Sequence, residues 1–493
     1  MERGTSTHHI KFYMLFNSID FALFLPIVFL IYWGIVQKSI SVQNVFIILA
    51  SYTFYGWWDW RFLFLILTST LVDYFVGLGL KKQESQKRRK ALLGLSIATN
   101  IGILVFFKYY NFFLDNFVNA FSLFGKEISV TSLQIILPVG ISFYTFQTLS
   151  YSIDVYKRKI APTTDFFAFT AFVCFFPQLV AGPIERAKHL LPQFQKKRYF
   201  KYEDAVDGLK QILWGLFKKM VIADTCGRYA DLAFTHTADY NSSSLVLGVL
   251  FFSFQIYADF SGYSDIAIGV AKLFGFDLKQ NFRNPYFSSS VIEFWRRWHI
   301  SLSTWFRDYV YIPLGGSNVS TIGFVRNILL VFIVSGFWHG ASWTFVIWGF
   351  LHAVLYLVTY FLRQRNKKKF SSEHTYQVLY VCKIFFTFLL VSFAWIFFRA
   401  NSIQHAFLYI HNLFSTSMNS FPNFISKGNL LVLLFFLILL LFIEWKGRED
   451  HHAIKKLFQK RHRLLRWSFY SLLIFFIGMF ANTDEVPFIY FQF

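Results

Sequence analysis

The sequence predicts an all-α, polytopic integral membrane protein, and three observations lead to this fold class. Apolar residues make up 55% of the 493 positions and charged residues only 15%, whereas average proteins contain about 45–50% and about 25%. Phenylalanine alone occupies 67 positions. The apolar residues also gather in runs near the roughly 17–25 residues that a helix needs to cross a bilayer. So few charges could not cover a soluble surface of this size, so most of the exterior is expected to face lipid.

Eleven apolar segments predict about eleven transmembrane helices in one membrane domain covering residues 14–493. Two of these segments, 244–275 and 328–361, are too long for one simple crossing and are interrupted by Gly, Ser or Asp. Each is therefore expected to hold two shorter helices or one bent helix. The eleven segments are residues 19–36, 43–59, 62–80, 91–107, 133–153, 166–182, 244–275, 328–361, 378–398, 429–445 and 467–481.

The first thirteen residues are polar and unlike the chain that follows, so residues 1–13 are expected to be an N-terminal extension. Met14 is then an alternative start of the protein. No cleavable signal is evident, because Asp20 lies beside the first span and no small-residue cleavage site follows it.

The net charge of +21 divides into short basic clusters between the apolar segments. The positive-inside rule places these clusters in the cytoplasm and the N-terminus outside. Clusters of this kind suit anionic lipid headgroups, and no nucleic acid is expected as a partner. The clusters are residues 81–90, 157–159, 363–369 and 446–466, and the segments expected outside are 108–132, 224–243 and 399–428.

Two segments do not read as plain spans. Residues 183–223 mix Lys and Arg with apolar residues, which predicts cytoplasmic or interfacial helices. Residues 291–310 have apolar side chains at offsets typical of one amphipathic helix, with three tryptophans on that face and arginines opposite. Such a helix is expected to lie in the membrane interface or dip into it, and a full crossing is not expected. Its apolar face consists of Val291, Phe294, Trp295, Trp298, Leu302, Trp305, Phe306 and Tyr309.

His339 is the first candidate for chemistry, because an ionisable residue inside an apolar span is costly and usually functional. It lies in SGFWHGASW (335–343), between Gly336 and Gly340, which permit a bend or a close helix approach. A histidine can accept a proton from a hydroxyl near neutral pH, so a general base is one reading. The other is a buried histidine bonded to a carbonyl across a helix pair. His352 also lies in an apolar span, and a packing role is expected for it.

Two further groups contain polar residues in apolar surroundings. His299 lies at the edge of the apolar face of 291–310, where either headgroups or a protein cavity would surround it. Asp259 and Asp265 fall in YADFSGYSDIAIG (257–269) with Ser261 close by, and their spacing puts them on different sectors of a helix. A paired acid–base dyad is therefore not supported, and structural support is the expected role of both aspartates.

Several sequence signatures of other enzyme classes are absent from the chain. No phosphate-binding loop, dinucleotide turn, zinc-protease H-E-x-x-H or hydrolase G-x-S-x-G is present. The three cysteines, Cys174, Cys226 and Cys382, are too widely spaced for a disulfide scaffold or a zinc ribbon. What remains is a membrane site without a metal, built around histidine.

The chain resembles the membrane-bound O-acyltransferase family, in the branch of the alginate O-acetylation proteins and their peptidoglycan-acetylating relatives. The resemblance covers residues 14–493 and implies the fold of that family, with helices around a central tunnel. The matching stretches are FKYYNFF (107–113), LPVGISFYTFQTLSYSIDVYK (137–157), FVCFFPQLVAGPIERA (172–187), YADFSGYSDIAIGVAKLFGF (257–276), NFRNPYFSSSVIEFWRRWHISLSTWFRDYVYIPLGG (281–316), SGFWHGASWTFVIWGFLH (335–352) and FIYFQF (488–493).

The resemblance also implies roles for individual residues. The family's signature histidine maps onto His339, which is expected to be catalytic, and the second family position maps onto His299, which is expected to belong to the site. Trp338 and Trp343 are expected to shape the tunnel rather than react. Trp298, Asp259 and Ser261 are expected to be supporting residues, with no chemical step assigned to any of them.

The expected activity is O-acyl transfer across a bacterial plasma (inner) membrane, most simply of acetyl. The resemblance implies an acyl thioester such as acetyl-CoA as co-substrate from the cytoplasm, with no bound cofactor. It also implies a polysaccharide acceptor outside, such as alginate, peptidoglycan or cellulose, and a separate extracytoplasmic SGNH-type transferase as partner beside the membrane lipids. Two alternatives stay open: D-alanyl transfer to teichoic acid, and an ion- or proton-coupled transporter that uses Asp259, Asp265 and His339.

Overall fold

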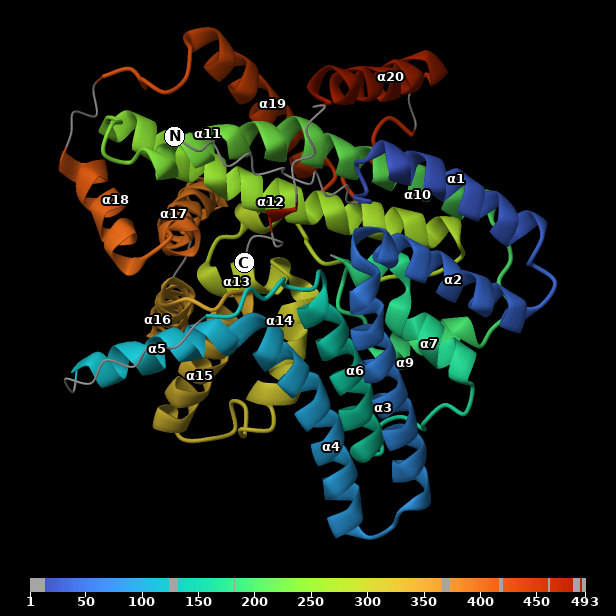
Figure 1. The fold of residues 1–493 in the computed structure, drawn as a ribbon. Helices are drawn as coiled ribbons and strands as arrows, with labels where there is room; N and C mark the ends of the chain where they lie inside the picture. Colours follow the sequence, from blue (N-terminus) through green and yellow to red (C-terminus); the bar gives the residue numbers. More distant parts are fainter. Residues whose placement is uncertain are drawn as a thin grey trace, which may run out of the picture.

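The computed structural model describes residues 14–123, 132–180, 182–365, 373–415, 420–459, 462–481 and 488–489. These residues form α-helices with short 3₁₀ and π segments, and no β-strand occurs among them. The long helix α12 (Ser242–Leu273) runs through the middle, with groups of helices on either side of it (Figure 1). The predicted all-α membrane fold is confirmed. The proposed extension 1–13 lies outside the described residues.

Eight continuous helical stretches among the described residues are long and apolar enough to cross a membrane. The expected count of eleven is not confirmed. Residues 133–153 contain only the 16-residue α6 (Ile141–Tyr156), and 166–182 folds as the short helices α7 (Phe166–Cys174) and α8 (Phe176–Leu179). The eight are Ile40–Lys82, Gln86–Leu123, Ser242–Leu273, Thr321–His339, Trp343–Arg365, Gln377–Arg399, Lys427–Lys446 and Arg463–Phe480, and the shorter α1 covers Ile19–Gly34.

A buried polar network holds the N-terminal helices together. The Asp73 carboxylate, fully buried on α3, accepts hydrogen bonds from Ser152 (2.5 Å), Asn100 (2.7 Å) and Ser96. These side chains come from α6 and α4, so one carboxylate ties three helices together. The elements of this region are α2 (Ile40–Asp59), the 3₁₀ turn η1 (Trp60–Phe62), α3 (Leu63–Lys82), α4 (Gln86–Leu104), the π segment η2 (Val105–Tyr109) and α5 (Tyr110–Leu123).

Helix α10 packs against α12 with their backbones in close contact, because glycines face each other at two levels. A Cβ on Gly208 would lie 2.7 Å from the carbonyl oxygen of Gly269, and one on Gly262 would lie 2.8 Å from that of Gly215. Small residues permit such approaches between helices in membranes. The elements here are α9 (Ala187–Phe194), α10 (Tyr202–Leu216), the π segment η3 (Phe217–Ala223) and α11 (Asp224–Thr235).

The expectation that 183–223 forms cytoplasmic or interfacial helices stays a prediction, and none of the described helices of spanning length lies in this segment. Two of its lysines, Lys218 and Lys219 on η3, are almost fully buried inside the protein. Lys218 pairs with Asp265 (2.6 Å), and Lys219 pairs with Asp224 (2.8 Å) and Asp259 (2.9 Å). Buried charges are tolerated when paired in this way. The local sequence shows the lysines but not their partners, which lie on α11 and α12.

The C-terminal half completes the helical assembly. Residues 328–361 divide into two helices, which was one of the two predicted arrangements. Of the segment 244–275, all but the last two residues belong to the single 32-residue α12. The elements are η4 (Pro285–Phe287), α13 (Val291–Arg297), α14 (Ile300–Phe306), η5 (Arg307–Tyr311), α15 (Thr321–His339), α16 (Trp343–Arg365), α17 (Glu373–Arg399), α18 (Ile403–Ser415), α19 (Lys427–Lys446) and α20 (Arg463–Phe480).

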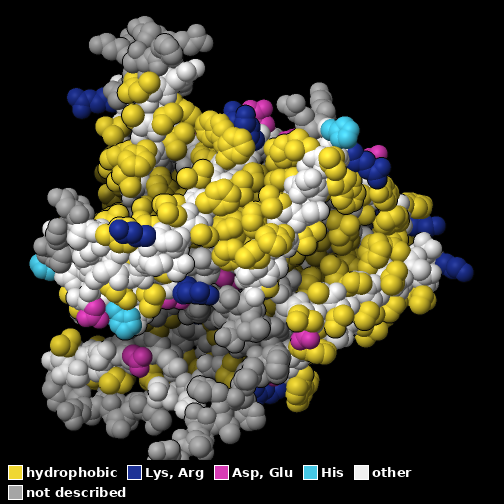
Figure 2. All heavy atoms as spheres, turned by 90° about the horizontal axis from the view of Figure 1, so that it is seen from above, with side chains coloured by type: hydrophobic (Ala, Val, Ile, Leu, Met, Phe, Trp, Pro, Cys, Tyr) yellow, Lys and Arg dark blue, Asp and Glu magenta, His cyan; other side chains and the backbone are white. Residues whose placement is uncertain are grey.

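Much of the exterior is apolar, as the composition predicts. Figure 2 shows one face on which hydrophobic side chains cover most of the described surface and charged groups are scattered. Large apolar side chains with more than half of their surface exposed include Leu30, Phe385, Phe435 and Ile474, which lie on different helices. A surface of this kind suits contact with lipid tails.

Candidate active site

His339 is the last residue of α15, at a place where α15 and α16 approach closely. A Cβ on Gly336 would lie 2.2 Å from the carbonyl oxygen of Phe345, and one on Gly349 would lie 2.3 Å from that of Phe332. The glycines therefore serve a close helix crossing, one of the two roles that the sequence left open. This crossing fixes the position of the turn that carries His339.

The His339 side chain is buried among aromatic rings. Only 3% of its surface is exposed. Its ring centroid lies 4.9 Å from that of Trp338, 5.2 Å from that of Trp348 and 5.4 Å from that of Phe398, all in edge-on contacts. The imidazole thus occupies a water-poor environment, in which hydrogen bonds and charges act more strongly than in water.

Two residues of η2 bind the end of α15, where backbone carbonyls lack partners within the helix. The Lys108 ammonium donates to the carbonyl oxygens of Trp338 (2.9 Å) and His339 (2.8 Å). The Tyr109 hydroxyl donates to that of Phe337 (2.9 Å). The FKYYNFF motif therefore holds the turn that carries His339. Sequence reasoning assigned Lys108 no role, although an ionisable residue next to an apolar span was the available signal.

His299 lies at a break between two short helices, and this corrects the expectation of one continuous amphipathic helix over 291–310. α13 ends at Arg297, and His299 takes a left-handed backbone conformation (φ 42°, ψ 55°) before α14 begins. Such a conformation is uncommon for a residue other than glycine and is often found at functional sites. The apolar face that was expected to meet the membrane interface is mostly buried inside the protein.

Asn281 explains the break, because it replaces the helical hydrogen bonds that would cross it. Its backbone carbonyl accepts from the Ile300 N–H (2.8 Å), and its side-chain oxygen accepts from the N–H (3.2 Å) and hydroxyl (2.9 Å) of Ser301. The same oxygen lies 3.2 Å from Nδ1 of His299. Since that oxygen can only accept, Nδ1 of His299 carries the hydrogen and Nε2 presents a lone pair.

His299 is therefore a neutral hydrogen-bond acceptor. It lies outside the helices of spanning length, is 1% exposed, and burial lowers its pKa to about 3. No protein donor reaches its Nε2 among the described residues. Its ring lies 6.0 Å from that of Trp338, which also contacts His339. The structure thus places both predicted histidines around one tryptophan.

The remaining predicted residues lie at different distances from this pair. Trp298 is fully buried beside His299, whereas Trp343 is 52% exposed and donates from its indole to Asn116 on α5 (2.9 Å). Trp343 is thus placed at the surface. His352 accepts from the Trp295 indole (3.3 Å) and packs against Trp348, in line with the packing role expected for it.

Asp259 and Ser261 belong to the buried ion-pair region around η3. Asp259 pairs with Lys219 and accepts from the Ile489 backbone N–H (2.7 Å), and the Ser261 hydroxyl lies 2.9 Å from the Lys218 ammonium. These contacts give both residues a structural role. Among the described residues, no three His, Cys, Asp or Glu side chains come together in a group that could hold a metal ion.

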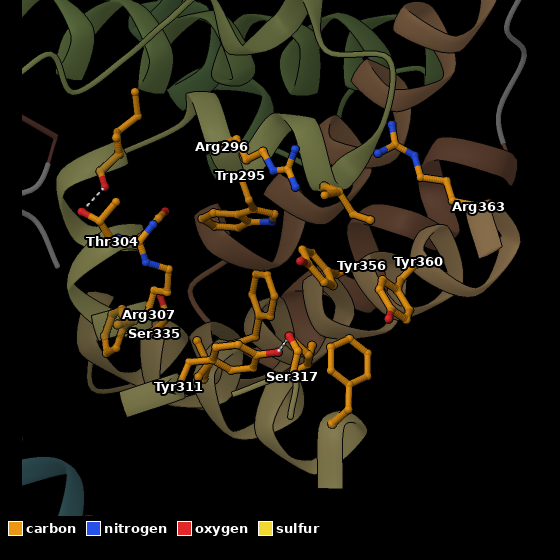
Figure 3. Close-up of a pocket in the computed structure, with 18 of the residues that line it drawn as sticks. Trp295, Arg296, Thr304, Arg307, Tyr311, Ser317, Ser335, Tyr356, Tyr360 and Arg363 are labelled. Carbon is orange, nitrogen blue, oxygen red and sulfur yellow. Dashed lines mark hydrogen bonds between the residues drawn. The ribbon is translucent and has the colours of Figure 1, made fainter. Parts of the chain in front are cut away.

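Two cavities lie near the part of α15 that carries His339. The first, with a volume of about 750 Å³, lies between α13, α14, α15 and α16 (Figure 3). Three arginines, Arg296, Arg307 and Arg363, are part of its lining, together with aromatic side chains, and it reaches Ser335, which lies four residues before His339 on α15. We call it the arginine cavity.

The second cavity, of about 40 Å³, is lined by His339 itself. Its other walls are Trp338, Lys108 and the segment 137–143. We call it the small cavity. Its volume exceeds the roughly 10–15 Å³ that one water molecule needs, so the small cavity has room for a small reacting group.

Comparison with known proteins identifies similar chains. Residues 157–402 match the model of the membrane-bound O-acyltransferase family. The chain is 38% identical to the probable alginate O-acetylase AlgI of Azotobacter vinelandii, over 82% of this chain and 78% of that protein. It is 37% identical to the peptidoglycan O-acetyltransferase of Helicobacter pylori, over 80% and 79%. The teichoic acid D-alanyltransferase of Bacillus subtilis is 29% identical over 54% of this chain and 70% of that protein.

Proposed function

This chain belongs to the membrane-bound O-acyltransferase family, and we propose that it moves an acetyl group from a cytoplasmic thioester to a polysaccharide outside a bacterial plasma membrane. The observation that carries the proposal is a pair of cavities near the end of α15: one is lined by His339, and the other is lined by Ser335, four residues earlier on the same helix. An acyl donor and an acceptor can then meet at one buried imidazole. The relatives named above as an alginate O-acetylase and a peptidoglycan O-acetyltransferase support acetyl as the group and a polysaccharide as the acceptor.

The arginine cavity suits the donor. Arg363 belongs to a basic cluster that the positive-inside rule places in the cytoplasm, and Arg296 and Arg307 lie in the same lining. Guanidinium groups bind phosphate strongly, as carried by coenzyme A. The deeper lining, with Trp295, Phe332 and Ile328, is apolar and suits the acyl end. The cavity then delivers the thioester along α15 toward His339.

The two histidines have different roles in the proposed reaction. His339 takes the proton of an acceptor hydroxyl, the hydroxyl oxygen attacks the thioester carbonyl, and the proton passes to the departing thiolate. A positioned general base contributes about 10²–10⁴-fold to such a step. Nε2 of His299 presents a lone pair, so it accepts a hydrogen bond from a second donor group of the acceptor and holds the acceptor in place, while the reacting hydroxyl gives its one hydrogen to His339. It is not arranged to polarise the carbonyl.

The polysaccharide is proposed to receive the acetyl group from a separate extracytoplasmic SGNH-type transferase. The hydroxyl that reacts at His339 then belongs to a carrier of the acetyl group and not to the polysaccharide. The small cavity supports this view, because its volume of about 40 Å³ suits a small reacting group better than a polysaccharide chain. Two alternatives are weaker. The teichoic acid D-alanyltransferase has the lowest identity and coverage among the relatives compared, which disfavours D-alanyl transfer. An ion path through Asp259 and Asp265 is disfavoured because these carboxylates already pair with Lys219 and Lys218.

Labelling of inverted membrane vesicles tests the function. Vesicles from cells that express the protein, with their cytoplasmic face outward, receive radiolabelled acetyl-CoA. We expect label in alkali-labile esters of the luminal polymer, and none in vesicles without the protein. Parallel vesicles receive radiolabelled D-alanine with cytosol and ATP. Label from alanine alone in the polymer, or label that crosses without entering esters, would refute acetyl transfer.

Arg296→Gln is expected to raise the KM for acetyl-CoA by about 10- to 150-fold with little change in kcat, because one charge-assisted contact to phosphate is worth roughly 1.5–3 kcal/mol. The KM for acetyl-pantetheine, which lacks the nucleotide phosphates, should stay unchanged. The matched control is Arg61→Gln, since Arg61 is exposed and paired with Asp59 away from this cavity. An equal rise for both donors would show that the cavity does not bind phosphate.

A further inference from the structure

Several buried tryptophans near the histidines have indole N–H groups without an acceptor. Trp298, Trp338 and Trp348 are among them, each less than 5% exposed, and no protein acceptor lies within hydrogen-bond distance of their Nε1 atoms among the described residues. Buried polar groups are almost always paired, because an unpaired donor loses its bonds to water without replacement. Each of these groups therefore needs an explanation.

Several other tryptophans of the same structure find acceptors. The indoles of Trp33 and Trp305 donate to backbone carbonyls (both 2.9 Å), and that of Trp295 donates to His352 (3.3 Å). The three unpaired indoles named above lie beside the histidines: Trp338 and Trp348 contact His339, and Trp298 precedes His299 in the chain. A ligand at this place would supply the missing acceptor.

Trp338 is the one of the three that a ligand can reach. It belongs to the lining of the small cavity beside His339, whereas Trp298 and Trp348 line neither that cavity nor the arginine cavity. Its ring contacts both histidines, with centroids 4.9 Å from His339 and 6.0 Å from His299. Lys108 binds the Trp338 carbonyl and so fixes the backbone of this residue.

The chemistry of acyl transfer needs such a donor. Attack on a thioester turns the carbonyl oxygen into an oxyanion, which enzymes stabilise with fixed N–H groups. His299 cannot serve here, because its Nδ1 hydrogen is engaged by Asn281 and its Nε2 is an acceptor. His339 is occupied with the proton of the hydroxyl. The two histidines therefore leave the carbonyl oxygen without a partner.

We propose that Trp338 is a catalytic residue whose indole N–H binds the thioester carbonyl oxygen and the oxyanion formed from it. This inference rests on the proposed function. The acceptor O–H bond breaks toward His339, a C–O bond forms, and the carbonyl π pair moves onto the oxygen held by Trp338. Collapse restores the carbonyl, breaks the C–S bond, and the thiolate takes the proton from His339. The resemblance to the family assigned Trp338 only a part in shaping the tunnel.

Replacing the N–H of Trp338 while keeping its shape tests the proposal. Incorporation of 3-benzothienylalanine at position 338 exchanges the N–H for sulfur, and Trp338→Phe removes it with part of the ring. In the vesicle assay with acetyl-CoA, we expect kcat to fall about 10²-fold, the loss typical of one oxyanion donor. The KM for acetyl-CoA should not change. Resistance to thermal unfolding should be unchanged or higher for the benzothienyl variant, because an unpaired buried donor is removed.

Three comparisons make the result decisive. Trp467→Phe, on the exposed face of α20, should keep full activity. A benzothienyl variant with wild-type kcat would overturn the proposal. A lower kcat in Trp348→Phe, together with an unchanged kcat in the variants at position 338, would also overturn it. Loss of activity accompanied by lower thermal stability in the benzothienyl variant would indicate a packing role and also overturn it. His339→Ala in the same assay tests the proposed function separately, so acetyl transfer can stand where the role of Trp338 fails.

Discussion

His339→Ala is expected to lower the rate of ester formation by about 10²–10⁴-fold, the contribution of a positioned general base. The imidazole lines the small cavity and can take a proton from a hydroxyl, whereas the Lys108 amine in the same lining is bound to the carbonyl oxygens of Trp338 and His339. His339→Gln should lose as much, because it keeps a polar group of similar size but not the basic nitrogen. The measurement is acetyl transfer per unit of protein in inverted membrane vesicles.

The control for this substitution is His236→Ala, since His236 is exposed and pairs only with Asp239 in a loop. Its activity should equal that of the wild type, and the thermal stability of both His339 variants should show that the fold is intact. A folded His339→Ala protein that still acetylates the polymer at the wild-type rate would contradict the general-base role. Membership of the family would remain, and the base would have to be sought elsewhere.

Lys219→Met is expected to lower the free energy of unfolding by about 3–5 kcal/mol, the usual cost of removing one partner of a buried ion pair. Lys219 is 1% exposed and binds two carboxylates, those of Asp224 (2.8 Å) and Asp259 (2.9 Å). Without the ammonium, two buried negative charges face each other. Reversible unfolding in mixed micelles with increasing SDS measures the difference.

Lys201→Met is the matched control, because the Lys201–Asp204 pair is exposed and its atoms are 4.0 Å apart. Pairs of this kind contribute at most about 1 kcal/mol, so the unfolding curve should barely move. Equal effects of the two substitutions would mean that Lys219 and its partners are solvated rather than buried. The fold described around η3 would then be wrong.

The parts of the fold that the sequence predicts depend on local patterns. Long apolar runs identify the helices, and the glycines near His339 identify a bend or a close approach, which the structure shows as a helix crossing. The segment 291–310 shows what local patterns do not predict. Its apolar spacing continues without interruption through Trp298 and His299, and no proline or glycine marks a boundary. The break arises from Asn281, whose bonds to Ile300 and Ser301 cannot be read from the segment itself.

In the candidate site, too, local sequence patterns predict some features, and contacts between distant residues determine the others. His339 is found from its own surroundings, because a histidine between glycines in an apolar span is unusual. The burial of Lys218 and Lys219 could not be predicted, because their acidic partners include Asp265 and Asp259, which are distant in the chain on α12. The unpaired indole of Trp338 has no signal in the sequence at all, since pairing of an N–H is a property of the packed structure.

The ion pairs between η3 and α12 also set an order for biogenesis. Helix α12 carries Asp259 and Asp265 within an apolar stretch, and each charged residue near the centre of an inserting helix costs about 2.5–3.5 kcal/mol. Its lysine partners, Lys218 and Lys219, are synthesised first, on the segment that precedes α11. We therefore expect α10, η3 and α12 to leave the translocon as one unit, with their charges already matched, rather than to enter lipid one helix at a time.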